Sequence, residues 1–171
     1  MSPKPAADLA FDLAFMDHAL ALAQAQLGQT APNPSVGRVI VRQGAVIAAA
    51  VTGVGGRPHA EEIALETLGG MAPDATAYVT LEPCFARSSG APGCSSRLIE
   101  ARLARVVIAC LDPHPTAKGG VERLRAAGIE VETGLREAEA LYLNRGFFKW
   151  VETGRPWVTL DGSLASHDAE F

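Results

Sequence analysis

The sequence predicts an α/β protein in which one mixed sheet of about five strands lies between two layers of helices, a three-layer α-β-α arrangement. Three observations lead to this class: a first segment with apolar residues at helical spacing, then a hairpin pattern, and then strands that alternate with helices. The length of 171 residues is enough to bury one core. We therefore expect one domain, residues 1–153, followed by a tail, residues 154–171.

Composition narrows the classes of partner. Hydrophobic residues make up 48% of the chain and charged residues 20%, which is typical of a globular protein. The net charge of −4 gives no basic surplus, so we expect no obligatory nucleic-acid partner. No apolar run approaches the ~18 residues of a membrane span, and the N-terminus lacks a signal-type apolar core. We expect a cytoplasmic protein without a membrane segment, in which cysteines stay reduced.

The first helix is expected over residues 11–27, where Phe15, Ala19, Leu22 and Ala23 recur at helical spacing. Gly28 and the Pro32-Asn33-Pro34 run end it. Two prolines fix the backbone around Asn33, so its amide could recognise a ring by donating and accepting hydrogen bonds. An asparagine of an ordinary turn is the alternative, and the residues alone do not separate the two.

A hairpin follows, with strands over residues 36–41 and 45–51 and a turn at Gln43-Gly44. A helix then begins at His59 and ends at Gly69-Gly70, which places His59 and Glu61 in its first turn, at the positive end. We expect Glu62 and Glu66 on the solvated face of this helix.

Strands and helices alternate through the rest of the chain. The expected strands are residues 76–81, 105–110 and 129–131, the expected helices are 94–101, 119–127 and 136–150, and 157–160 is strand-like. Cys110 ends an apolar strand, and we expect it to be a buried thiol without a chemical role.

The residues that carry chemistry are His59, Glu61, Cys84 and Cys94. One imidazole and two thiolates form a three-ligand zinc set, and the open fourth position of such a site holds water. Glu61 is not needed as a ligand and is free to move protons, which favours hydrolytic attack on an amino-bearing ring carbon. A structural zinc site closed by His114 as fourth ligand is the competing hypothesis.

Four segments resemble one known family. Thr-Ala-Pro-Asn-Pro-Ser-Val-Gly at 30–37, Pro-His-Ala-Glu at 58–61, Tyr-Val-Thr-Leu-Glu-Pro-Cys at 78–84 and the 105–113 segment are similar to the pyrimidine deaminases of riboflavin biosynthesis. That family removes an amino group from diaminohydroxyphosphoribosylaminopyrimidine. The resemblance implies a cytidine-deaminase-like fold, Zn²⁺ bound by His59, Cys84 and Cys94, Glu61 as proton shuttle and Asn33 as a pyrimidine contact.

The sequence departs from this family in three places. The segment between Cys84 and Cys94 is one residue longer than usual and lacks the usual His and Gly-Arg/Lys-Thr, so we expect Arg87 to meet the substrate phosphate. His114 stands where Asn is usual. Residues 156–164 resemble the start of a reductase domain, and the sequence ends at Phe171, so we expect neither a reductase nor an NADPH site.

These departures keep two further hypotheses open. One is a zinc deaminase that acts on another nucleobase, nucleoside or nucleotide, and the other is a zinc-containing binding module without catalysis. For the deaminase we expect a small pyrimidine as partner and a homo-oligomer, a dimer.

Overall fold

The computed structural model describes residues 5–87 and 90–159. Within these ranges five strands form one mixed sheet in the order β2-β1-β3-β4-β5. Their bounds are β1 Gly37–Arg42, β2 Ala45–Val51, β3 Thr76–Leu81, β4 Arg105–Cys110 and β5 Glu130–Thr133. Strand β1 pairs antiparallel with β2 and β3, whereas β3, β4 and β5 run parallel. The predicted α/β class and mixed sheet are confirmed.

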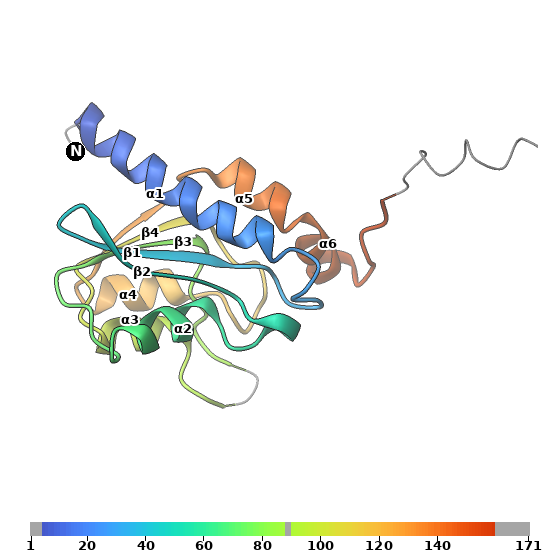
Figure 1. Cartoon of the computed structure of the whole chain (residues 1–171). Coiled ribbons are helices and arrows are strands. Elements are labelled where there is room, and N and C mark those ends of the chain that lie inside the picture. The colour runs from blue at the N-terminus through green and yellow to red at the C-terminus, as the bar shows by residue number, and fades with distance from the viewer. Residues whose placement is uncertain (1–4, 88–89, 160–171) are drawn as a thin grey trace, which may run out of the picture.

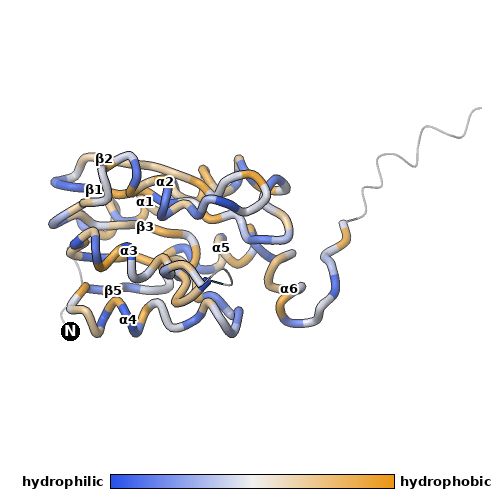
Figure 2. Tube along the Cα trace, turned by 90° about the horizontal axis from the view of Figure 1, so that it is seen from below, coloured by the Kyte–Doolittle hydropathy of each residue, from blue (hydrophilic) through white to orange (hydrophobic). Residues whose placement is uncertain are grey.

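Helices cover both faces of the sheet (Figure 1). Helices α1 (Ala6–Ala25) and α5 (Glu137–Leu143) lie on one face, and α2 (Ala60–Thr67), α3 (Cys94–Glu100) and α4 (Gly120–Ala126) lie on the other. Each face buries its own apolar cluster, around Ile40 and Leu98 on the α2 side and around Met16 and Val107 on the α1 side. Helix α6 (Arg145–Thr153) lies beyond α5 at one end of the sheet (Figure 2).

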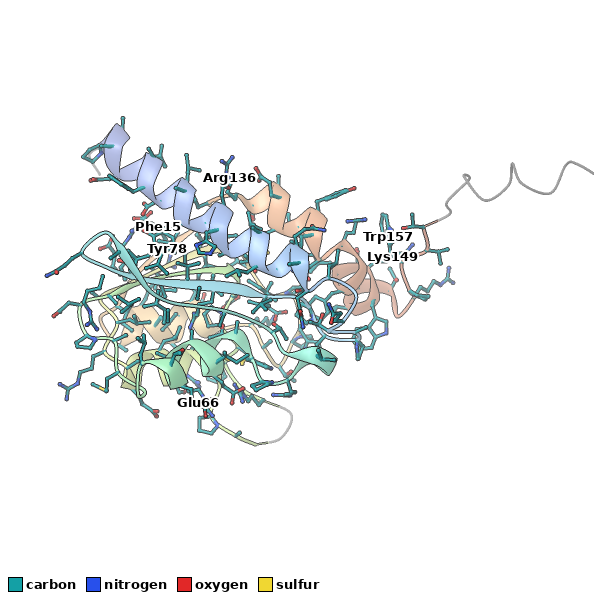
Figure 3. All side chains as sticks on the ribbon, viewed as in Figure 1. Phe15, Glu66, Tyr78, Arg136, Lys149 and Trp157 are labelled. Carbon is teal, nitrogen blue, oxygen red and sulfur yellow. The ribbon has the colours of Figure 1, made fainter. Side chains whose placement is uncertain are left out.

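Helix α1 begins at Ala6, earlier than the sequence pattern predicts, and packs closely on β1. A Cβ atom at Gly37 would lie 1.8 Å from the carbonyl oxygen of Ala19, so only glycine permits this approach. The rings of Phe15 and Tyr78 also meet between α1 and the sheet, with centroids 5.3 Å apart (Figure 3). The buried residues of the helix are Asp12, Met16, Ala19 and Ala23.

The predicted helix over residues 136–150 is wrong, because the structure has two helices there. The break falls at Asn144, whose buried side chain accepts from the amide of Ser35 at 2.9 Å and donates to the Ser35 carbonyl at 3.0 Å. This pairing over 109 residues of chain fixes Asn144 between α5 and α6. Periodicity cannot detect it, because helical spacing continues on both sides.

The predicted strand-like segment near the end of the chain and the expected lack of a membrane span can both be compared with the structure. Residues 157–159 form no strand, and residue 160 of the strand-like segment lies outside the described residues. No helix in the described part of the chain is long and apolar enough to cross a membrane.

Candidate active site

The candidate site lies where parallel strands end and two helices begin. Cys84 follows β3, His59 is the N-cap of α2, and Cys94 is the first residue of α3. Carboxyl ends of parallel strands meet at one edge of a sheet, which is where ligands bind in open α/β folds. The three predicted metal ligands, far apart in sequence, are therefore brought together by the topology.

The geometry of these ligands fits zinc. The ligand atoms of His59, Cys84 and Cys94 all lie within 4.8 Å of one another. His59 Nδ1 is 3.1 Å from Cys94 Sγ and 3.9 Å from Cys84 Sγ. Tetrahedral zinc with bonds of ~2.3 Å to sulfur and ~2.1 Å to nitrogen separates such atoms by roughly 3.6 Å. Three ligands at this spacing leave one coordination position for water. The ring nitrogen of His59 that faces both sulfur atoms, and would bind the metal, is Nδ1.

The surroundings favour the thiolate form of Cys84. The side-chain hydrogen bond from Cys94, followed by contacts with His59 and the Cys94 amide, lowers the pKa of Cys84 to about 4. The Cys94 amide donates to Cys84 Sγ at 3.3 Å. Because thiolates are the metal-binding form of cysteine, this environment prepares Cys84 for a metal ion.

Glu61 is buried beside the ligands, with 3% of its surface exposed. It shares a cavity of about 50 Å³ with all three ligands and with Asn33. The other residues of the cavity wall are Pro34, Val36, Thr52, Gly56, Leu81, Glu82 and Asp112. The structure thus gathers five of the six predicted site residues around one small cavity.

Asn33, which lines this cavity, is held in place by hydrogen bonds and by packing. Its side-chain amide donates to the Gly55 carbonyl at 3.3 Å, and Thr30 Oγ1 donates to its carbonyl at 3.0 Å. Gly56 packs directly against it, because a Cβ there would lie 2.1 Å from Asn33 Nδ2. These contacts fix the side chain of Asn33. Its contact with a pyrimidine stays a prediction.

Arg87 has partners that the sequence did not indicate. Its Nη1 donates to Glu62 Oε1 at 2.8 Å and its Nη2 donates to Cys94 Sγ at 3.4 Å. The side chain is only 4% exposed. The guanidinium therefore supports a metal ligand through a hydrogen bond. Its contact with a substrate phosphate stays a prediction.

The prediction that Glu62 lies on the solvated face is wrong. Its Oε2 accepts from the His59 amide at 2.9 Å, while Oε1 pairs with Arg87 and, at 3.2 Å, with Arg97. Burial raises its pKa, but the hydrogen bond from Arg87 and the His59 amide outweigh this and lower it to about 2. Glu three residues after an N-cap is the sequence signal that could have found this role.

Two more residues at the site escaped the sequence analysis. Arg38 in β1 is fully buried, and its Nη2 lies 3.7 Å from Glu61 Oε1. Asp112 follows β4, and burial raises its pKa to about 6 although it accepts from the His114 amide at 2.8 Å. His114 itself contacts Thr116 Oγ1 through Nδ1 at 2.9 Å and is outside the three-residue metal group found among the described residues.

Known proteins share this arrangement. Residues 10–110 match the model of the cytidine and deoxycytidylate deaminase zinc-binding region, more than half of the chain. The chain belongs to the cytidine and deoxycytidylate deaminase family. The matched residues include His59, Glu61, Cys84 and Cys94.

Individual relatives narrow the comparison. The chain is 45% identical over 164 residues to the riboflavin biosynthesis protein RibD of Aquifex aeolicus, covering 91% of this chain and 45% of the relative. It superimposes on Acinetobacter baumannii RibD with a TM-score of 0.81 and 46% identity, over 88% of this chain and 42% of that one.

A third relative is matched over a similar share of both chains. The diaminohydroxyphosphoribosylaminopyrimidine deaminase/5-amino-6-(5-phosphoribosylamino)uracil reductase of Thermotoga maritima gives a TM-score of 0.83 and 38% identity, over 88% of this chain and 44% of that one. These likenesses confirm the cytidine-deaminase-like fold. The chain spans less than half the length of these relatives.

Proposed function

We propose that this chain catalyses the hydrolytic deamination of an aminopyrimidine, and that its substrate is diaminohydroxyphosphoribosylaminopyrimidine in riboflavin biosynthesis. One observation carries the reaction type: a buried carboxylate, Glu61, shares a small cavity with three zinc ligands and Asn33. Similarity to the RibD proteins over nine tenths of the chain supports the choice of substrate.

Each residue has a defined task in this reaction. His59, Cys84 and Cys94 hold the metal, and bound zinc supplies a Lewis acid that makes water nucleophilic at neutral pH. Glu61 takes a proton from the attacking water and delivers it to a ring nitrogen. A carbon–oxygen bond forms at the amino-bearing carbon as this proton moves. Glu61 then transfers the remaining proton of the new hydroxyl group to the amine, the carbon–nitrogen bond breaks, ammonia leaves and a carbonyl remains on the ring. Asn33 holds the ring at the cavity edge.

The substrate phosphate is assigned to Arg87, the cation between the two cysteine ligands. Because Arg87 Nη1 pairs with Glu62, contact with a phosphate requires the guanidinium to exchange this partner. The rate of the phosphorylated pyrimidine should be compared with that of its dephosphorylated form. A clear preference for the phosphorylated form supports the assignment, whereas equal rates refute it.

The reaction is tested by ammonia release from the zinc-loaded protein. The panel contains diaminohydroxyphosphoribosylaminopyrimidine, cytidine, deoxycytidylate and adenosine, each measured for kcat/KM. We expect the riboflavin precursor to be turned over best. A higher kcat/KM for another base would favour the related deaminase, and no ammonia from any compound would favour a non-catalytic zinc module.

The setting of the reaction belongs to the same proposal. We place the activity in residues 1–153, in the cytoplasm, and in a homodimer. The three cysteines are free thiols, which suits a reducing compartment. Light scattering coupled to size-exclusion chromatography measures the mass in solution, and the mass of a single chain would refute the dimer.

A further inference from the structure

Arg38 is a buried cation in an apolar layer. It lies in β1 on the same strand face as Ile40, which belongs to the core under α2, and it is 0% exposed. Its cross-strand neighbours are Ala50 and Val79, which carry no charge. None of its three guanidinium nitrogens has a hydrogen-bond partner among the described residues. A buried charge without hydrogen bonds is strongly unfavourable unless an opposite charge compensates it.

Within residues 5–87 and 90–159, the charged groups that face Arg38 belong to the candidate site. Glu61 Oε1 lies 3.7 Å from Nη2, and the thiols of Cys84 and Cys94 are the other groups that interact with it electrostatically. Two thiolates offset the charge of one zinc ion, so in the loaded site the carboxylate of Glu61 is the negative charge that pairs with Arg38. Arg38 supplies one matching positive charge from the side of the sheet.

We propose that Arg38 is a positioning residue that pairs with the carboxylate of Glu61 and holds it in place beside the metal ligands. The guanidinium approaches from the sheet and does not line the cavity, so it does not compete with substrate or water. With no hydrogen bond from Arg38 to Glu61, the carboxylate keeps its lone pairs for proton transfer while the charge pair limits its movement. The role in catalysis rests on the proposed function, whereas the charge pair does not.

Stability tests the pair without any substrate. Thermal unfolding is compared for the zinc-loaded wild type, Arg38→Met, Glu61→Gln and the double variant, with the exposed Glu66→Gln as control. Each single change leaves one buried charge alone, so each should lower Tm by about 4 °C or more. The double variant should lie closer to wild type than either single variant. Losses that simply add in the double variant overturn the pair.

Kinetics test the positioning role. Arg38→Met should lower kcat by about 10- to 100-fold with little change in KM, since the pyrimidine does not touch Arg38. Arg38→Lys, which keeps the charge, should recover part of the loss, and Arg38→Met should cause no further loss in the Glu61→Gln background. Unchanged kcat, or equal losses in both backgrounds, makes Arg38 a structural counter-ion and overturns the positioning role. If the wild type released no ammonia, the proposed function would fail, and the Tm comparison would decide the pair.

Discussion

At the scale of single residues, Glu61 is the group on which the proposed chemistry depends. Its carboxylate is buried beside the metal ligands, whereas Glu66 on the same helix is exposed and points away from the body (Figure 3). We expect Glu61→Gln to retain one zinc ion and to lower kcat by roughly 10²- to 10⁴-fold, because general acid–base transfer is lost.

Metal analysis and ammonia release measure the two effects separately. Glu66→Gln is the matched control, with the same change of charge on the same helix, and should keep both zinc and activity. Loss of zinc in Glu61→Gln would mean that Glu61 acts on the metal site and not on proton transfer.

Asp112 gives a second prediction at this scale. Burial raises its pKa to about 6 from an ordinary value of 3.8. Because the folded-state pKa is the higher one, Asp112 contributes stability below about pH 4 that is lost as pH rises through about 6. The free energy of unfolding of wild type minus that of Asp112→Asn should therefore fall between these values, by up to about 3 kcal/mol.

Denaturant unfolding across this pH range measures the difference. The exposed Asp8→Asn serves as control and should show no such pH dependence. A difference for Asp112→Asn that stays constant with pH would show that the carboxyl ionises in the folded protein as it does in the unfolded chain.

At the scale of elements, the short helical turn η1 (Val54–Gly56) controls the place of Asn33. Gly55 and Gly56 both have positive φ, 72° and 86°, so alanine strains the backbone at either position. Only at Gly56 would the added Cβ meet Asn33, whereas nothing lies within 4 Å of one at Gly55. We expect Gly56→Ala to lower kcat/KM at least about 10-fold more than Gly55→Ala.

The two variants separate backbone strain from displacement of the amide. Both should lose stability through the strained backbone, Gly56→Ala more so because of the added contact with Asn33, and thermal unfolding reports both losses; only Gly56→Ala should raise KM. Equal kinetic effects of the two substitutions would remove Asn33 from substrate binding.

The elements also show what the sequence could predict. The strands and helices follow from local patterns in the sequence, so most of the fold could be predicted. The metal group could be predicted because one histidine and two cysteines are typical zinc ligands, and the fold brings His59, Cys84 and Cys94 together. The break at Asn144 depends on Ser35, over 100 residues away, and no local pattern contains it. Arg38 was missed for a related reason, because a charged residue in a strand indicates a partner only after the strand is placed beside α2.

At the scale of the whole molecule, the metal site joins three segments of the chain. Its ligands come from the start of α2, the loop after β3 and the start of α3, so a bound ion fixes three segments to one another. A ligand that binds only the folded state stabilises it by mass action. Free zinc at 100 times its dissociation constant should add about 2.7 kcal/mol and raise Tm by about 5–10 °C.

Thermal unfolding with zinc and with an excess of chelator measures this shift. Cys94→Ser should abolish the shift, since it removes a ligand. Cys110→Ser is the matched control: Cys110 is buried in β4 outside the metal group, with Sγ donating to the Thr80 carbonyl at 3.3 Å, so the variant should lose stability but keep the zinc response. A wild-type Tm that does not respond to zinc would mean that the three ligands do not bind the ion, and the deaminase mechanism would lose its basis.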